Sequence, residues 1–272
     1  MSPFQNSDNP AIIPAINKNM LEIFKILSSS PKSEIRSSEE LIWSITDIPF
    51  PLFNFVLYSS FKTGGAEKAI ETVVTECRSR KVPVMWRLDP KTQPDNLGTL
   101  LEMHGFQLSE IIPGMAIDIQ KNIHPPTQNG FEIKRVSDEQ ILTDYLKVVK
   151  EVVEMPDFAV KELHDFCVFL GFEENLPMQR FLGYLNDEPV ATSMFVLGAG
   201  VVGIYDVTTL SKARKKGIGS TMTFHALECA YNLGYNIGVL TSSEEAYNMY
   251  KKLGFREICK IPHYSWDPSV SE

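Results

Sequence analysis

The chain of 272 residues is 43% hydrophobic, which is enough to bury two ordinary cores. Its formal net charge of −8 argues against nucleic acid as the main partner, because phosphate backbones bind basic surfaces. No window of about eighteen uncharged apolar residues occurs, and the N-terminus lacks the basic and apolar blocks of a secretory signal. The sequence therefore predicts a cytoplasmic protein without a membrane partner, and an acidic surface suits a cationic amine as substrate.

Turn residues and hydrophobic periodicity divide the first half of the chain into short elements. The expected elements are a helix at 9–27, a helix or strand at 39–44, a strand at 53–58, a helix at 66–80, a strand at 83–88, a short helix at 97–104 and a strand at 115–119. The polar stretch at 121–130 is rich in turn formers and is predicted to be a linker.

The second half opens with a predicted strand at 131–136 and two helices, at 137–153 and 158–170. Three strands joined by tight turns then predict an antiparallel meander over 181–207. A helix at 218–233, a strand at 237–241 and a helix at 244–253 follow, and a last strand at 256–266 is expected to complete the sheet of this half.

The four cysteines are scattered, without a C-x-x-C pair or a His-rich neighbourhood: Cys77, Cys167, Cys229 and Cys259. This spacing predicts neither a metal site nor a disulfide framework. We expect reduced thiols that are mostly buried, and no metal cofactor.

The stretch 205–220 leaves an apolar strand, passes three cations and enters a helix through two glycines. Gly217 and Gly219 let the backbone approach a ligand closely, and the amides at the start of the helix favour an anion. Arg214, Lys215 and Lys216 add positive charge. The pattern predicts an anion cradle, although a glycine pair alone is equally compatible with a plain helix start.

Two other phosphate loops do not fit this stretch. A P-loop requires a lysine directly after its last glycine, and a dinucleotide-binding loop requires a third glycine where Met222 stands. The remaining pattern, R-x-x-G-x-G, resembles the acyl-CoA pyrophosphate loop of the GNAT superfamily of N-acetyltransferases. The resemblance covers about 131–266 and includes a second motif, Tyr250 to Phe255.

The GNAT resemblance implies acetyl-CoA as co-substrate, bound along the splayed strand that enters the loop and at the helix start. Ser211 departs from a common proline, and Ser243 from a common asparagine before the last helix. Carried over position by position, the expected cofactor-binding residues are Val207, Thr208, Thr209, Arg214, Lys215, Lys216, Gly217, Ile218, Gly219, Ser220 and Ser243.

In this family an amine attacks a thioester directly, so the site needs an oxyanion donor, a base and a proton for the thiolate. A backbone amide between Val207 and Thr209 is the expected oxyanion donor. Tyr250 is the candidate general acid, with helix packing as its alternative role. The candidate bases are Asp206 and Glu173, with Glu174 beside it; each is also a plausible surface carboxylate, and His164 and His263 are weaker candidates.

Two function classes stay open: an N-acetyltransferase for a small-molecule or protein amine, and a non-catalytic acyl-CoA-binding module. An intact loop together with Tyr250 favours the enzyme.

The two halves share an order of strand, helix, strand, short helix, Gly-Phe and strand. This shared order favours two copies of one unit over two unrelated domains. Together with the GNAT resemblance it implies an α/β (α+β) fold with two GNAT-like domains, each a mixed, largely antiparallel twisted sheet flanked by helices. Residues 1–125 form the expected degenerate copy, because Leu101 replaces Tyr250 and no R-x-x-G-x-G precedes its long helix; residues 131–272 form the expected catalytic copy. Walling the acceptor site, completing the fold or forming a homodimer are open roles for the first copy.

Overall fold

The computed structural model describes residues 3–27, 32–62, 64–90, 92–119 and 128–269. Most of the expected linker at 121–130 lies outside these residues. The chain forms two compact units, and neither is contiguous in sequence. Unit 1 comprises Met1–Ile23 and Met115–Glu257, and unit 2 comprises Phe24–Gly114 and Ile258–Glu272.

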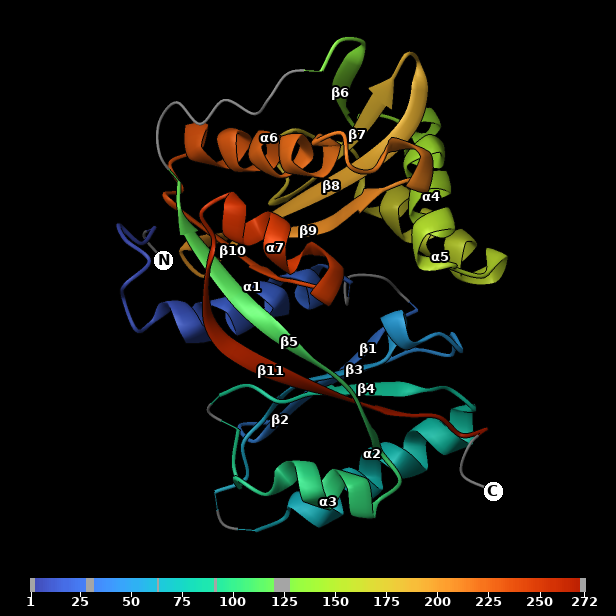
Figure 1. Ribbon diagram of the computed structural model, residues 1–272. Coiled ribbons are helices and arrows are strands. Elements are labelled where there is room, and N and C mark those ends of the chain that lie inside the picture. The colour runs from blue at the N-terminus through green and yellow to red at the C-terminus, as the bar shows by residue number, and fades with distance from the viewer. Residues whose placement is uncertain (1–2, 28–31, 63, 91, 120–127, 270–272) are drawn as a thin grey trace. The chain divides into compact units, whose positions relative to one another are not determined.

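Unit 1 is built on a mixed sheet whose first four strands are antiparallel neighbours, as the meander predicts (Figure 1). The end of β5 (Gln107–Asp118) lies on the far side of β10, which pairs with β9 in parallel. The strands are β6 (Phe131–Arg135), β7 (Met178–Leu185), β8 (Glu188–Gly198), β9 (Val201–Thr209) and β10 (Ile237–Thr241).

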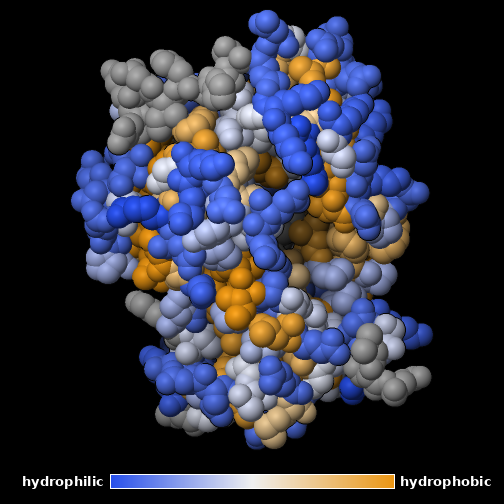
Figure 2. Space-filling view, in the orientation of Figure 1, coloured by the Kyte–Doolittle hydropathy of each residue, from blue (hydrophilic) through white to orange (hydrophobic). Residues whose placement is uncertain are grey.

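Helices cover both faces of this sheet: α4 (Glu139–Val153), α5 (Asp157–Leu170), α6 (Ile218–Asn232) and α7 (Glu244–Lys252). Alternation along the strands decides which face each helix covers. Ser193 of β8 points to α6, where its hydroxyl donates to the Met222 carbonyl. Tyr145 of α4 reaches β9 from the opposite face, while the surface over α4 and β6 is mainly hydrophilic (Figure 2).

The first helix, α1 (Ile12–Leu27), joins unit 1 through one buried amide. Asn19 donates to the carbonyls of Val196, Gly198 and Val201 at 2.9, 3.1 and 3.3 Å, and its oxygen accepts from the Tyr205 hydroxyl at 2.8 Å. One side chain thus satisfies several backbone groups that the β8–β9 hairpin leaves open.

Unit 2 has a smaller sheet with the strand order β1-β2-β3-β4-β11. Its β3 and β4 are parallel, whereas the pairs β1–β2, β2–β3 and β4–β11 are antiparallel, so in both units a run of antiparallel neighbours leads to a parallel pair. The elements are β1 (Glu34–Ser37), β2 (Leu41–Ile45), the 3-10 turn Pro51–Phe53, β3 (Phe55–Ser59), α2 (Ala66–Arg80), β4 (Val84–Arg87), α3 (Leu97–Met103) and β11 (Arg256–Trp266).

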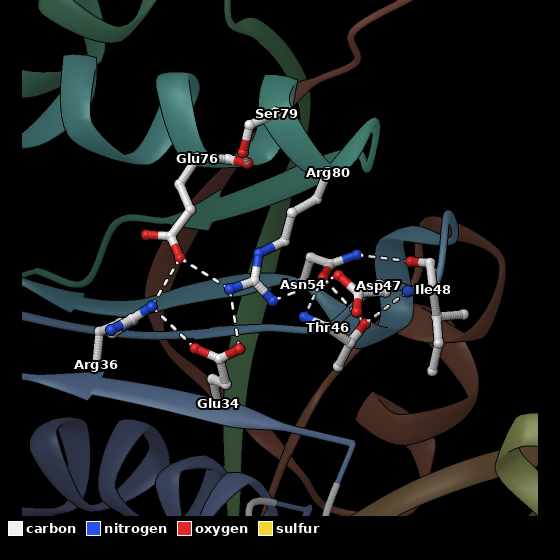
Figure 3. A network of polar contacts seen from close by, with 9 residues as sticks. All are labelled: Glu34, Arg36, Thr46, Asp47, Ile48, Asn54, Glu76, Ser79 and Arg80. Atoms are coloured by element: carbon white, nitrogen blue, oxygen red, sulfur yellow. Dashed lines mark hydrogen bonds and ion pairs between the residues drawn. The ribbon is translucent and has the colours of Figure 1, made fainter.

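Ion pairs tie α2 to β1 in unit 2 (Figure 3). The Arg80 guanidinium lies 2.9 Å from Glu34, 3.1 Å from Glu76 and 3.4 Å from Asp47, and Arg36 lies 2.8 Å from both glutamates. The network is partly exposed, so water screens each ion pair. Each pair alone therefore adds little to the stability of unit 2, and the contribution comes from the pairs acting as a connected network.

The mixed, largely antiparallel α/β fold is confirmed, and the helix expected at 66–80 has the bounds of α2. The open assignment at 39–44 is resolved as strand β2. The last strand differs from expectation: β11 pairs with β4 of unit 2, with His263 opposite Arg87, instead of completing the sheet of the second half. Its alternating pattern fixes which side is buried but not which sheet it joins. None of the described helices has the length and apolar character needed to cross a membrane.

Candidate active site

Strand β9 carries a bulge at Asp206. Met194 of β8 faces Tyr205 and Thr192 faces Thr208, so two residues of β9 lie opposite the single Ser193. Asp206 has a φ of 50°, a left-handed conformation that aspartate adopts more readily than most side chains. The bulge turns Asp206 towards α4, on the same side as Thr208.

Beyond the start of β9, its edge towards β10 is open. The parallel pairing consists of Val202 with Gly238 and Gly203 with Val239. No pair with β10 occurs from Ile204 to Thr209 among the described residues, whereas the other edge stays paired with β8 up to Thr209. The backbone groups on this open edge are available to an extended ligand.

The loop after β9 presents the start of α6 without a cap. Gly217 occupies the N-cap position with a φ of 77°, which glycine adopts without strain, and none of the described side chains caps the helix. The first hydrogen bond of the helix runs from the Thr221 amide to the Gly217 carbonyl, 3.0 Å. The earlier amides point outward together with the positive end of the helix dipole, as an anion site requires.

Four cations lie beside this helix start, and two of them form ion pairs. Lys212 is 2.6 Å from Glu188, and Arg214 is 2.7 Å from Glu245 while its Nε donates to the Thr209 carbonyl at 3.1 Å. Lys215 and Lys216 are exposed, and in the described part of the chain no carboxylate lies within 4 Å of either. These two lysines keep their charge available for an anionic ligand.

Gly219 lies where the loop, β9 and α7 meet. A Cβ at this position would stand 3.3 Å from Met249 Sδ and 3.6 Å from Thr209 Oγ1. Even alanine would crowd this junction, and a branched side chain would push α6 away from α7 or fill the space before the helix amides.

On the opposite face of the sheet, Asp206 meets α4. The Tyr145 hydroxyl donates to Asp206 Oδ2 at 3.0 Å, and the Thr192 hydroxyl contacts both the Asp206 carbonyl and the Thr208 hydroxyl at 2.6 Å. The Asp206 side chain reaches solvent, yet protein atoms crowd around its carboxyl and displace part of its water. This desolvation raises the pKa of the carboxyl above its ordinary value, while Arg180 and the Tyr145 hydrogen bond lower that pKa.

A family model describes this region. Residues 142–255 match the model of the acetyltransferase (GNAT) family, and the match lies wholly within unit 1. This segment is a GNAT acetyltransferase domain. It contains the bulge, the open edge of β9, the loop and Tyr250. No curated protein matches the chain.

Solved structures share the fold over nearly the whole chain. A GCN5-related N-acetyltransferase from Kribbella flavida is 17% identical with a TM-score of 0.70, covering 92% of this chain and 94% of its own. One from Sphaerobacter thermophilus is 14% identical with a TM-score of 0.64, covering 98% and 94%. A tandem GNAT protein from the clavulanic acid biosynthesis pathway is 10% identical with a TM-score of 0.61, covering 100% and 99%. At these identities the likeness shows the fold alone.

Within the GNAT domain, Tyr250 is buried, and its ring packs edge-on against Phe255 with centroids 5.5 Å apart. Burial raises the pKa of Tyr250 to about 12, and a hydrogen bond with Thr223 opposes that rise. The phenol is therefore protonated at neutral pH. The buried ring packs α7 against the core, and the phenol keeps a proton that it could donate. The environment of Tyr250 is therefore compatible with both expected roles, helix packing and general acid.

Two further expected residues have structural partners of their own. The Ser243 hydroxyl caps α7 by accepting from the Ala246 amide at 3.3 Å. Glu173 is exposed in the loop after α5, and its carbonyl accepts from the Gln179 amide group at 3.0 Å. Glu174 is 3.5 Å from Arg135. Cofactor contact by Ser243 and proton transfer by Glu173 stay predictions.

Two of the four thiols are buried and two are partly exposed. Cys77 and Cys167 are buried, and burial raises the pKa of Cys77 to about 12 and that of Cys229 to about 11. These thiols stay protonated and are poor nucleophiles. Within the described ranges, no three His, Cys, Asp or Glu side chains form a group that could hold a metal.

Sequence reasoning missed Tyr145 and Arg180. Tyr145 belongs to the buried stripe of an amphipathic helix, where a tyrosine is indistinguishable from a core residue. Arg180 precedes the expected start of a strand and reaches the site only through pairing across β8.

Proposed function

We propose that the GNAT domain transfers an acetyl group from acetyl-CoA to a primary amine, of a small molecule or of a protein, by direct attack. One observation carries the proposal: a bulged strand with an open edge leads directly into an uncapped, glycine-started helix. The first feature suits an extended amide-bearing arm, and the second suits a pyrophosphate.

The residues present fit acetyl-CoA. Main-chain groups of Val207 and Thr209 would pair with the pantetheine arm, and the amides of Gly217 to Ser220 would hold the pyrophosphate beside Lys215 and Lys216. Bound acetyl-CoA supplies an activated thioester. Thr208 points to the α4 face, where its hydroxyl contacts Thr192, so its part in cofactor binding would come from its backbone.

Asp206 would accept the proton of the attacking amine. The Tyr145 hydrogen bond fixes the orientation of the carboxylate, and a raised pKa makes Asp206 a stronger base than an ordinary surface aspartate. Activity should therefore rise with pH as the Asp206 carboxyl loses its proton. Glu173 is the alternative base, and water could link it to the amine.

As the nitrogen–carbon bond forms and the carbon–sulfur bond breaks, negative charge develops first on the carbonyl oxygen and then on sulfur. A backbone amide at Val207, next to the bulge, would stabilise the oxygen. Tyr250 would supply the proton to sulfur. With a pKa of about 12 it is a weak acid, so it would donate only to a well-developed thiolate.

Release of free CoA thiol when candidate amines are added, with mass spectrometry of the acetylated product, tests the proposal. The alternative is an acyl-CoA-binding module. In that case calorimetry would detect acetyl-CoA binding at one site per chain, but no amine would release thiol. The cytoplasmic address, the homodimer, and the absence of metal, nucleic-acid and membrane partners stay predictions.

A further inference from the structure

The face of the sheet that α4 covers carries two opposite charges that do not touch. Arg180 of β7 is opposite Met194 of β8, which is opposite Tyr205 of β9. Directly opposed residues place their side chains on the same face, so these three form one row. The neighbouring Ser193 points to α6, which assigns the row to the α4 face, where Asp206 also lies.

Neither charge has an ionic partner among the residues of unit 1 that the structure describes. The Arg180 guanidinium is partly buried, and its hydrogen bond runs to Met178 Sδ at 3.1 Å. Among the described residues no carboxylate lies within 4 Å of Arg180, and no cation lies within 4 Å of Asp206. Yet Arg180 lies near enough to lower the pKa of Asp206, Tyr145 and Cys167.

A partly buried guanidinium is stabilised by a carboxylate that accepts two parallel hydrogen bonds. Neighbouring strands are about 4.8 Å apart, so the backbones of β7 and β9 are about 10 Å apart, a distance that the long Arg180 side chain and a small molecule can span together. A molecule carrying both an ammonium group and a carboxylate would satisfy both ends of this gap. A simple amine would leave Arg180 without an anion.

We propose that the acetyl acceptor is a small amino acid, whose amino group is held by Asp206 and whose free carboxylate binds Arg180. This inference rests on the proposed acetyl transfer. On binding, the ammonium nitrogen loses one proton to Asp206, which releases that proton to solvent after the reaction. The nitrogen loses its second proton as the amide bond forms and the carbon–sulfur bond breaks, and this loss balances the proton that Tyr250 gives to the departing thiolate. The product keeps its carboxylate but has lost its positive charge, so it loses its attraction to Asp206 and dissociates.

Matched acceptors test the inference. Each free amino acid is compared with its carboxamide and with the amine that lacks the carboxylate, using thiol release from acetyl-CoA. We expect kcat/KM for the best amino acid to exceed that of its amide by about a hundred-fold or more, as for a site built around a substrate group. Equal rates for the three compounds would overturn the amino-acid inference and leave acetyl transfer intact. No thiol release from any compound would overturn both.

Variants separate recognition from folding. Arg180→Met keeps a long side chain and should raise KM for the amino acid by about a hundred-fold, while the rate with the matched amide, measured at a pH where Asp206 is ionised in both proteins, changes little. Lys134→Met is the control, because Lys134 is an exposed cation of the same sheet that pairs with Glu132 at 3.4 Å. Equal losses with amino acid and amide would indicate a structural role for Arg180 and contradict the inference.

Two measurements keep the test decisive if Arg180→Met is unstable. Arg180→Lys retains the charge without the paired donors, and should lie between the parent and Arg180→Met in KM with little change in kcat. Calorimetry of the amino acid with CoA present measures binding without turnover. Loss of amino-acid binding in both variants, with CoA binding unchanged, is expected; unchanged amino-acid affinity in both would refute the inference.

Discussion

The helix starts of the two units share one backbone solution and differ in chemistry. Gly65 before α2 and Gly217 before α6 both take left-handed conformations, with φ of 86° and 77°, and neither helix has a side-chain cap. Two positions after the capping glycine, α6 has Gly219 and α2 has the exposed Glu67. Glu67 satisfies the helix dipole of unit 2 with the chain's own carboxylate, whereas unit 1 leaves that place open to a foreign anion.

The bulge shows the same contrast. In β3, Val56 pairs with Trp43 and Tyr58 with Ile42, which leaves Leu57 without a counterpart in β2. Leu57 is buried, whereas Asp206 in the bulge of β9 is open to solvent. The bulge and the capping glycine therefore occur in both units as features of the fold. The side chains at these positions differ between the units and set the chemistry of unit 1. In unit 2 the charged side chains of α2 pair instead with those of β1 (Figure 3).

The largest effect should come from removing the charge in the bulge of unit 1. Asp206→Asn keeps the size and tolerates the left-handed backbone but cannot accept the amine proton. Turnover should fall by about 10²–10⁴, while acetyl-CoA affinity stays the same. Thiol release and calorimetry measure the two quantities. Asp187→Asn is the matched control, because Asp187 also has a positive φ, 64°, and lies exposed in the β7–β8 turn. A fully active Asp206→Asn protein would assign the base elsewhere, with Glu173 next in line.

Making α6 resemble α2 should abolish cofactor binding. Gly219→Glu places a carboxylate where the pyrophosphate would bind, and Gly219→Val fills the space beside Met249. We expect acetyl-CoA affinity to fall by about a hundred-fold or more in both, from charge repulsion and from blocked backbone approach. Arg214→Ala should weaken binding less, because its exposed pair with Glu245 already competes for the charge. Calorimetry decides, with circular dichroism to verify folding. Parent affinity in Gly219→Val would contradict the cradle.

Local signals predicted these architectural parts well. Turn residues and alternation located the meander, and glycines located both long helices, because these signals act over a few neighbouring residues. The same local signals could not predict which residues lie next to one another across the sheet. Arg180 and Asp206 share a face through the register of three strands, and Tyr145 approaches from a helix sixty-one positions earlier in the chain. The placement of β11 in unit 2 is likewise a long-range pairing that its own sequence does not specify.

Acid should destabilise unit 2 through His263. Burial, with Arg87 in second place, lowers the pKa of His263 to about 4, and Glu110 lies 3.7 Å from its Nδ1. An unfolded histidine binds its proton near pH 6.5, so the unfolded state takes up more protons below that pH. Stability is then complete above about pH 6.5 and falls by about 3 kcal/mol as the pH drops to about 4.

Tryptophan fluorescence measures this unfolding selectively. The three tryptophans of the chain, Trp43, Trp86 and Trp266, are all buried in unit 2. Urea midpoints recorded by fluorescence should decrease between pH 6.5 and pH 4 in the parent and decrease less in His263→Gln. Identical pH dependence in both proteins would show that other groups control the acid response.

A smaller effect is expected at Tyr250, where unit 2 has the fully buried Leu101. Tyr250→Phe keeps the ring and its contact with Phe255 but removes the proton. Turnover should fall by about 10², the lower end for a general acid, because a pKa of about 12 makes the phenol a weak donor. Tyr247→Phe is the control, because Tyr247 lies on the same helix as Tyr250 and its hydroxyl donates to Glu257 at 2.8 Å. A loss of about 1 kcal/mol of stability with parent turnover would instead identify Tyr250 as a packing residue.

The smallest effect tests whether unit 2 binds cofactor at all. Its loop has Lys62 where unit 1 has a run of cations, Phe61 is buried in the core, and Glu67 occupies the helix start. Calorimetry should therefore give one acetyl-CoA per chain, and Lys62→Ala should leave the affinity unchanged. Glu67→Gly separates backbone geometry from charge, because it introduces the glycine spacing of unit 1 without its lysines. If backbone geometry alone were sufficient, this variant would gain a second site. We expect it to stay at one, since exposed cations are needed to offset the repulsion between a pyrophosphate and an acidic protein.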